Sequence, residues 1–194
     1  IFSLFPSAWL KMAEEWELRG FRFLITPYVA ALIEKDLEGN PLEGDPIWRQ
    51  VFPYFEMAGM PDDAGGADSH KNPDEYSKTS ENWEVPQEMI SPIAQHKYDN
   101  RVIIYTGDAC LGYCVYCFRS LQSNAVEEKH GGRPHWKATM EAIALRSAIE
   151  EVILSGGDTL LFDNANVEEM LKDLRAIPHV KALRIHTRAW LHNP

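Results

Sequence analysis

The chain has 194 residues, of which 45% are hydrophobic and 25% charged, and this globular composition excludes disordered, collagen-like and disulfide-scaffold proteins. Its 19 basic and 29 acidic side chains give a formal net charge of −10, so its mean field disfavours binding to nucleic acid or to an anionic membrane. No apolar run approaches the roughly 20 residues that span a bilayer, and the first residues lack the basic segment of a signal peptide. We therefore expect a cytoplasmic protein.

Residues 1–60 are predicted to form a helical N-terminal region. Four apolar residues recur there at helical spacing: Trp9, Met12, Ala13 and Trp16. Thr26-Pro27 then begins a second helical pattern. Residues 61–100 are rich in Pro, Gly, Asp, Asn and Ser, which predicts a long loop or linker. A segment of this length serves as a lid, an arm or a linker, and its sequence does not distinguish these roles.

Residues 101–194 alternate short apolar runs with helical patterns. Strands are predicted at 101–105, 151–154 and 182–185, with helices at 134–147 and from Asn166 to the Ile177-Pro178 pair. Asn166 is predicted to cap the second helix, with Glu169 as its capping-box partner. This alternation predicts right-handed crossovers, a parallel sheet and the α/β class, with sites at the C-terminal ends of the strands.

The three cysteines, Cys110, Cys114 and Cys117, lie within eight residues. Cytosolic cysteines this close together more often bind metal or catalyse than form disulfides, and an odd number leaves one thiol out of any disulfide scheme. A structural zinc site needs four ligands, and the nearest downstream histidines, His130 and His135, do not supply a second knuckle. Three thiolates on one loop instead suit a [4Fe–4S] cluster with one open iron, while a zinc-stabilised binding module remains an alternative.

The C-x₃-C-x₂-C spacing, with an aromatic residue before the last cysteine, resembles the signature of the radical S-adenosylmethionine (SAM) superfamily. Five further segments narrow the resemblance to the lysine 2,3-aminomutase family: residues 25–28, 96–101, 154–158, 175–180 and 184–188. The resemblance extends from about residue 21 to residue 188 and is weakest between 60 and 90. It implies that residues 101–194 form the first three βα units of a partial TIM-type barrel, preceded by the helical N-terminal region and the 61–100 loop.

For function, the resemblance implies an isomerase that uses a [4Fe–4S] cluster, SAM and pyridoxal 5′-phosphate (PLP). Such an enzyme moves an amino group between adjacent carbons of an amino acid by way of a 5′-deoxyadenosyl radical. Its partners would be a small-molecule amino acid and a reductant such as flavodoxin or ferredoxin. A radical SAM enzyme without PLP is the alternative, and the identity of the amino acid and the presence of a homo-oligomer stay open.

The resemblance also assigns roles to individual residues. The three cysteines would hold the cluster, and Tyr116 would lie near the adenine of SAM. The remaining SAM contacts would come from two segments: Ser155, Gly156, Gly157 and Asp158, then Thr187 and Arg188. On spacing alone, the first of these segments also fits a tight strand-to-helix turn with a capping aspartate.

Two further sites are implied. Tyr98 and Arg101 match positions that help hold the phosphate and ring of PLP, and Lys97 stands where the family tends to have arginine in the same site. Arg119 matches the position that binds the substrate carboxylate, which suits the planar fork of a guanidinium. The family's Schiff-base lysine matches no lysine in the sequence, and the chain begins without Met, so we expect it to be the N-terminal portion of a longer protein.

Overall fold

The computed structural model describes residues 10, 11, 13, 14, 23–42, 44–52, 86–114, 116, 117 and 132–194. The chain divides into two compact units. We call residues 83–110 and 126–190 the sheet unit, and residues 1–82, 111–125 and 191–194 the N-terminal unit. Within the described ranges, no helix is long and apolar enough to cross a membrane.

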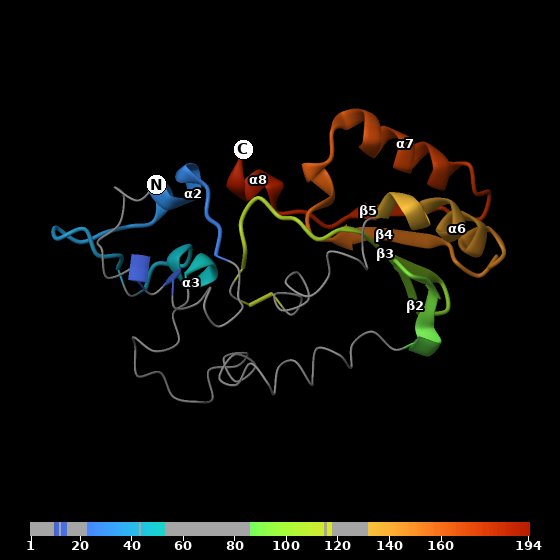
Figure 1. Cartoon of the computed structure of the whole chain (residues 1–194), viewed down its shortest axis with the longest axis horizontal. Helices are drawn as coiled ribbons and strands as arrows, with labels where there is room; N and C mark the ends of the chain where they lie inside the picture. The colour runs from blue at the N-terminus through green and yellow to red at the C-terminus, as the bar shows by residue number, and fades with distance from the viewer. Residues whose placement is uncertain are drawn as a thin grey trace. The chain divides into compact units, whose positions relative to one another are not determined.

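The sheet unit contains a five-stranded mixed sheet, in the spatial order β1-β2-β3-β4-β5 (Figure 1). Its strands are β1 (Met89–Ser91), β2 (Ala94–Tyr98), β3 (Arg101–Gly107), β4 (Glu151–Gly156) and β5 (Ala182–Ile185). The first three strands pair antiparallel, whereas β3, β4 and β5 pair parallel, as the sequence predicts for the last three. The α/β class is confirmed, and closure into a TIM-type barrel stays a prediction.

The sequence predicts a loop over residues 61–100, and this prediction is wrong for its C-terminal part. There the chain forms η3 (Pro86–Glu88), β1 and β2. The hydrophobic pattern of the sequence does not indicate these strands, because β1 is only three residues long and β2 carries polar side chains. Their partners stabilise them: Gln95 pairs with Ile103 of β3, and the Tyr105 hydroxyl donates to Gln95 Oε1 at 2.7 Å. Residues 53–85 lie outside the described part of the chain.

Two helices connect the parallel strands and lie alongside β4 and β5 in Figure 1. They are α6 (Gly132–Ala144) and α7 (Asn164–Arg175), and a 3₁₀ turn, η4 (Thr159–Leu161), precedes α7. The predicted cap of α7 is wrong: Asp163 is the N-cap, and its Oδ1 accepts from the backbone N–H of Asn166 at 2.8 Å. A carboxylate three residues upstream therefore takes the capping role that Asn166 was expected to fill.

The core of the sheet unit lies between one face of the sheet and these helices. Alternate residues of the parallel strands point into it, which is the period-two pattern of a strand. Its fully buried members include Val102, Ile104, Ile143, Val152, Leu154 and Leu174. The core therefore explains why the apolar runs in the sequence locate β3 and β4 correctly.

The N-terminal unit has a core of its own, built on α2 (Pro27–Leu32) and α3 (Trp48–Val51). Thr26 caps α2 by accepting from the Val29 N–H at 3.3 Å, and Pro27 occupies the first turn, as predicted. The core residues are Ile25, Val29, Ala30, Ile33, Trp48, Val51 and Phe52. Of the first predicted helix, residues 10, 11, 13 and 14 are helical, and Trp9, Met12 and Trp16 lie outside the described residues.

The burial of two leucines in the sheet unit predicts how much each contributes to the free energy of unfolding. Leu154 in β4 is fully buried, whereas Leu145 after α6 is 84% exposed. Leu154→Ala should lower the free energy of unfolding by about 2–5 kcal/mol, because it leaves a cavity. Leu145→Ala, the matched control, should change it by less than about 0.5 kcal/mol. Chemical denaturation of both variants measures the difference, and equal losses would contradict the placement of β4 in the core.

Candidate functional site

Predicted site residues meet at the C-terminal ends of β4 and β5, around the buried carboxylate of Asp158. Asp158 Oδ1 accepts from the Thr187 hydroxyl at 2.6 Å and from the Leu160 N–H at 3.0 Å. Its Oδ2 accepts from the Arg188 N–H at 2.8 Å. The structure thus brings together Asp158, Thr187 and Arg188, which the sequence places 30 residues apart.

These three hydrogen bonds give Asp158 a structural role. Through the Leu160 N–H it caps η4, which matches the strand-to-helix turn that the sequence offered as an alternative. A carboxylate has about four lone-pair sites, so three internal bonds leave about one for a ligand. Asp158 is 6% exposed, and its assignment as a SAM contact stays a prediction.

The two glycines of this segment lie against the chain that leaves β3. Gly156 has a φ of +113°, and a Cβ built on it would lie 2.5 Å from Gly107 O. A Cβ on Gly157 would lie 2.2 Å from Ala109 O. Two backbone hydrogen bonds join these segments. The Gly157 N–H donates to Gly107 O at 2.5 Å, and the Asp158 N–H donates to Ala109 O at 2.7 Å. Glycine is required at both positions by the chain's own packing, before any ligand is considered.

Two buried threonines, which the sequence did not single out, extend this network. Thr106 Oγ1 donates to the backbone oxygen of Ser155 at 3.0 Å and lies 3.0 Å from Thr159 Oγ1. Thr106 is near the end of β3 and Thr159 begins η4, so the hydroxyls link two neighbouring turns. The only signal in the sequence is that Thr106 is a polar residue directly after the apolar run 102–105.

The cysteines follow β3 directly. None forms a disulfide, all three are partly exposed, and the Cys117 N–H donates to Cys114 O at 3.0 Å. Cys110 belongs to the sheet unit and the other two to the N-terminal unit. No three His, Cys, Asp or Glu side chains within the described ranges are grouped to hold a metal ion. A metal centre at the three cysteines therefore stays a prediction from their spacing and thiol chemistry, since their side chains are not grouped as ligands.

Two other predicted residues belong with the cysteine loop in sequence. Tyr116, between two of the cysteines, is 57% exposed. Arg119 lies outside the described residues, so its contact with a substrate carboxylate stays a prediction.

The residues expected to hold PLP lie together at the opposite end of the sheet, at the hairpin that joins β2 to β3. Lys97 Nζ and Arg101 Cζ are each 5.8 Å from the centre of the Tyr98 ring. Arg101 Nε also lies 3.8 Å from Glu151 Oε2. At about 3.3 Å per residue, β3 separates this group from the Asp158 network by roughly 20 Å.

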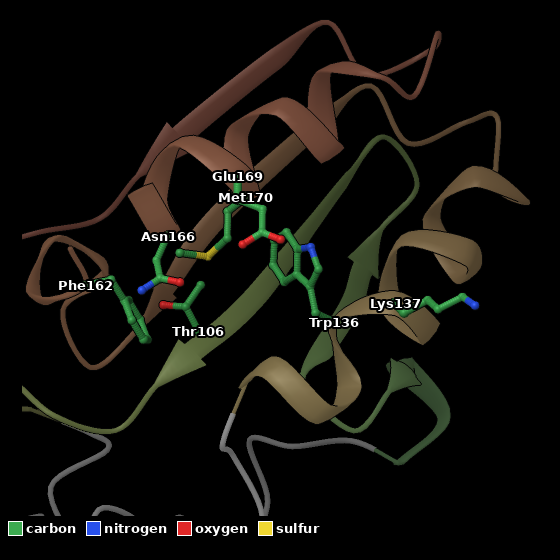
Figure 2. Close-up of a pocket in the computed structure, with 7 residues that line it drawn as sticks. All are labelled: Thr106, Trp136, Lys137, Phe162, Asn166, Glu169 and Met170. Carbon is green, nitrogen blue, oxygen red and sulfur yellow. The ribbon is translucent and has the colours of Figure 1, made fainter. Parts of the chain in front are cut away.

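A pocket of about 200 Å³ lies in the sheet unit beside α6 and α7. Its lining, shown in Figure 2, is Thr106, Trp136, Lys137, Phe162, Asn166, Glu169 and Met170. Lys137 extends away from the others in this view, and the Trp136 indole N–H donates to Asp173 Oδ2 at 2.8 Å. None of the predicted cofactor residues lines the pocket. It was not predicted because its walls come from separate elements.

Comparison with known proteins bears on the function of this site. No family model matches the chain. Curated proteins named L-lysine 2,3-aminomutase do match. The one from Acetoanaerobium sticklandii is 31% identical over 176 residues, or 88% of this chain, and the one from Bacillus subtilis is 32% identical over 171 residues, or 85%.

The chain belongs to the lysine 2,3-aminomutase family. The L-lysine 2,3-aminomutase of Escherichia coli strain K12 is 37% identical over a shorter stretch, 102 residues or 53% of this chain. The matched regions cover 36%, 31% and 29% of the relatives from A. sticklandii, B. subtilis and E. coli. The chain thus spans about a third of the length of these aminomutases.

The Asp158 network predicts an asymmetry between two aspartates. Asp158→Asn should lower the free energy of unfolding by about 1–3 kcal/mol, because the new amide NH₂ must face a backbone N–H that has lost its acceptor. Asp163→Asn is the matched control, since asparagine caps a helix about as well as aspartate. Urea denaturation of both variants measures the effect. A neutral Asp158→Asn would show that the carboxylate does not hold β4 and β5 together.

Proposed function

We propose that this chain forms the cluster-binding and SAM-binding part of an isomerase that moves an amino group between adjacent carbons of an amino acid. One observation carries the proposal: a C-x₃-C-x₂-C loop begins directly after β3, in a chain whose curated relatives are named L-lysine 2,3-aminomutase. The loop therefore starts at the strand end where parallel sheets place their sites.

Cys110, Cys114 and Cys117 would hold a [4Fe–4S] cluster. The donor set fits, since three thiols on a short loop provide the soft ligands that iron–sulfur clusters prefer. A cluster held by these three protein ligands would leave one iron open to bind SAM. A small electron carrier such as flavodoxin or ferredoxin would supply the electron.

The Asp158 network supports a SAM site at the same end of the sheet. Asp158 fixes the backbone of Arg188 and the hydroxyl of Thr187, so both follow β5 in a defined conformation. Ser155, Gly156 and Gly157 complete the segment proposed to receive the amino group of SAM. Tyr116 is proposed to lie beside the adenine.

The hairpin end of the sheet supports a phosphate site for PLP. Lys97 and Arg101 each place a cation 5.8 Å from the centre of the Tyr98 ring, and such cations donate charge-assisted hydrogen bonds to a phosphate. PLP supplies electron-accepting chemistry to amino acids, while the protein orients it and excludes water. The carboxylate of the amino acid substrate is proposed to bind Arg119.

The cluster assignment predicts the metal that the protein takes up. Anaerobic reconstitution with iron and sulfide should give one oxygen-sensitive [4Fe–4S] cluster, and Cys110→Ala, Cys114→Ala and Cys117→Ala should each abolish it, because each removes one of three protein ligands. Iron and sulfide analysis with electron paramagnetic resonance measures the outcome. Stoichiometric zinc without sulfide, in a preparation where a control iron–sulfur protein loads normally, would replace the proposal with a zinc module.

The carboxylate role of Arg119 predicts a different variant phenotype. An ammonium is a compact charge that cannot match two carboxylate oxygens in one plane, so Arg119→Lys should lower kcat/KM by about tenfold to a hundredfold. Cluster content and the spectroscopic response to SAM should stay unchanged. Unchanged turnover would remove Arg119 from the substrate site, and loss of the cluster would make it a structural partner of the cysteines.

A further inference from the structure

Gly112, in the middle of the first cysteine interval, lies in tight contact with the ring of His192. A Cβ built on Gly112 would lie 2.2 Å from Cε1, 2.6 Å from Nδ1 and 2.9 Å from Nε2 of that ring. Real Cβ atoms do not approach heavy atoms so closely, so a side chain at position 112 would have to displace the ring. Both residues belong to the N-terminal unit.

The ring has little freedom to move away. His192 is 2% exposed and ends α8 (Ala189–His192), and its neighbour Leu191 packs against the core of the N-terminal unit. The backbone oxygen of His192 accepts from Thr26 Oγ1 at 2.9 Å. Thr26 is also the N-cap of α2, so its hydroxyl ties the position of His192 to the start of that helix.

The segment that precedes α2, residues 24–26, also makes a direct hydrogen bond to the cysteine loop. The N–H of Tyr113, one residue before Cys114, donates to Leu24 O at 2.9 Å. Residues 24–26 therefore form hydrogen bonds with both Tyr113 and His192. The His192 ring in turn lies against Gly112. The Tyr113–Leu24 hydrogen bond and the Gly112–His192 packing contact therefore both link the loop to the chain that leads into α2.

We propose that His192 is a positioning residue for the cysteine loop, and that its ring sets the backbone path from Cys110 to Cys114 through Gly112. The inference rests on the proposed cluster only for its consequence, which is metal loading. Three thiolates can bind one cluster only if the backbone between them takes a compatible path. His192 would supply that constraint without touching the metal.

The test is a compensation experiment in the whole protein, with variants Gly112→Ala, His192→Ala and the double variant. Gly112→Ala overpacks the contact and should lower the iron and sulfide content after reconstitution by about tenfold. His192→Ala removes the ring, so the double variant should recover to within about twofold of His192→Ala alone. Gly44→Ala is the control, because a Cβ there meets no atom within 4 Å, and it should load like the wild type.

A second measurement does not need the cluster. Mass spectrometry can follow the rate at which iodoacetamide alkylates Cys114 in the apoprotein. This rate should rise in Gly112→Ala and in His192→Ala. In the double variant, the rise should be smaller than the product of the two single effects. Recovery in the double variant supports the proposal. Multiplicative effects, or no recovery of loading, overturn it. A wild type that takes no iron refutes the proposed function alone, since the alkylation series still decides the role of His192.

Discussion

The buried carboxylate of Asp158 is the interaction on which the C-terminal end of the sheet depends. A polar group removed from water destabilises a protein unless hydrogen bonds satisfy it, and the Asp158 side chain accepts three of them. Its donors come from η4 and from the residues after β5. One side chain therefore joins two turns, and the loss of any one donor would leave a buried oxygen with fewer partners. Thr187 and Arg188 owe their fixed positions to this bond pattern.

Gly156 and Gly157 hold the turn after β4 against the chain that leaves β3, at the same C-terminal end of the sheet. Because Gly156 and Gly157 have no Cβ, the turn after β4 can approach residues 107–109 closely enough for two backbone hydrogen bonds. Those residues lead directly into Cys110. The segment that resembles a ligand-binding motif therefore first fixes the chain that carries the first cysteine, and a side chain at either glycine would disturb that approach before it affected any cofactor.

The sequence predicts those parts of the fold whose cause is local. Strands β3 and β4 appear as apolar runs because their buried faces need such residues, and Thr26-Pro27 marks the start of α2 because a hydroxyl and a fixed φ suit a first turn. Strand β2 is missed because its pairing with β3, rather than its composition, makes it a strand. The Gly112–His192 contact joins residues 80 positions apart, and no spacing rule connects them.

The two groups of predicted cofactor residues lie at opposite ends of the parallel strands, and this constrains where the proposed chemistry would occur. One face of the sheet is buried under α6 and α7 through Val102, Val152 and Leu183. The alternate residues Ile103, Ile153 and Arg184 form a row across the other face and are only partly buried or exposed. The length of β3, roughly 20 Å, separates Arg101 at one end of the sheet from the Asp158 network at the other. The row of Ile103 and Ile153 runs across the less buried face between these two groups of residues, so this face, and not the one packed under α6 and α7, is the one open to a ligand that would reach from one group to the other.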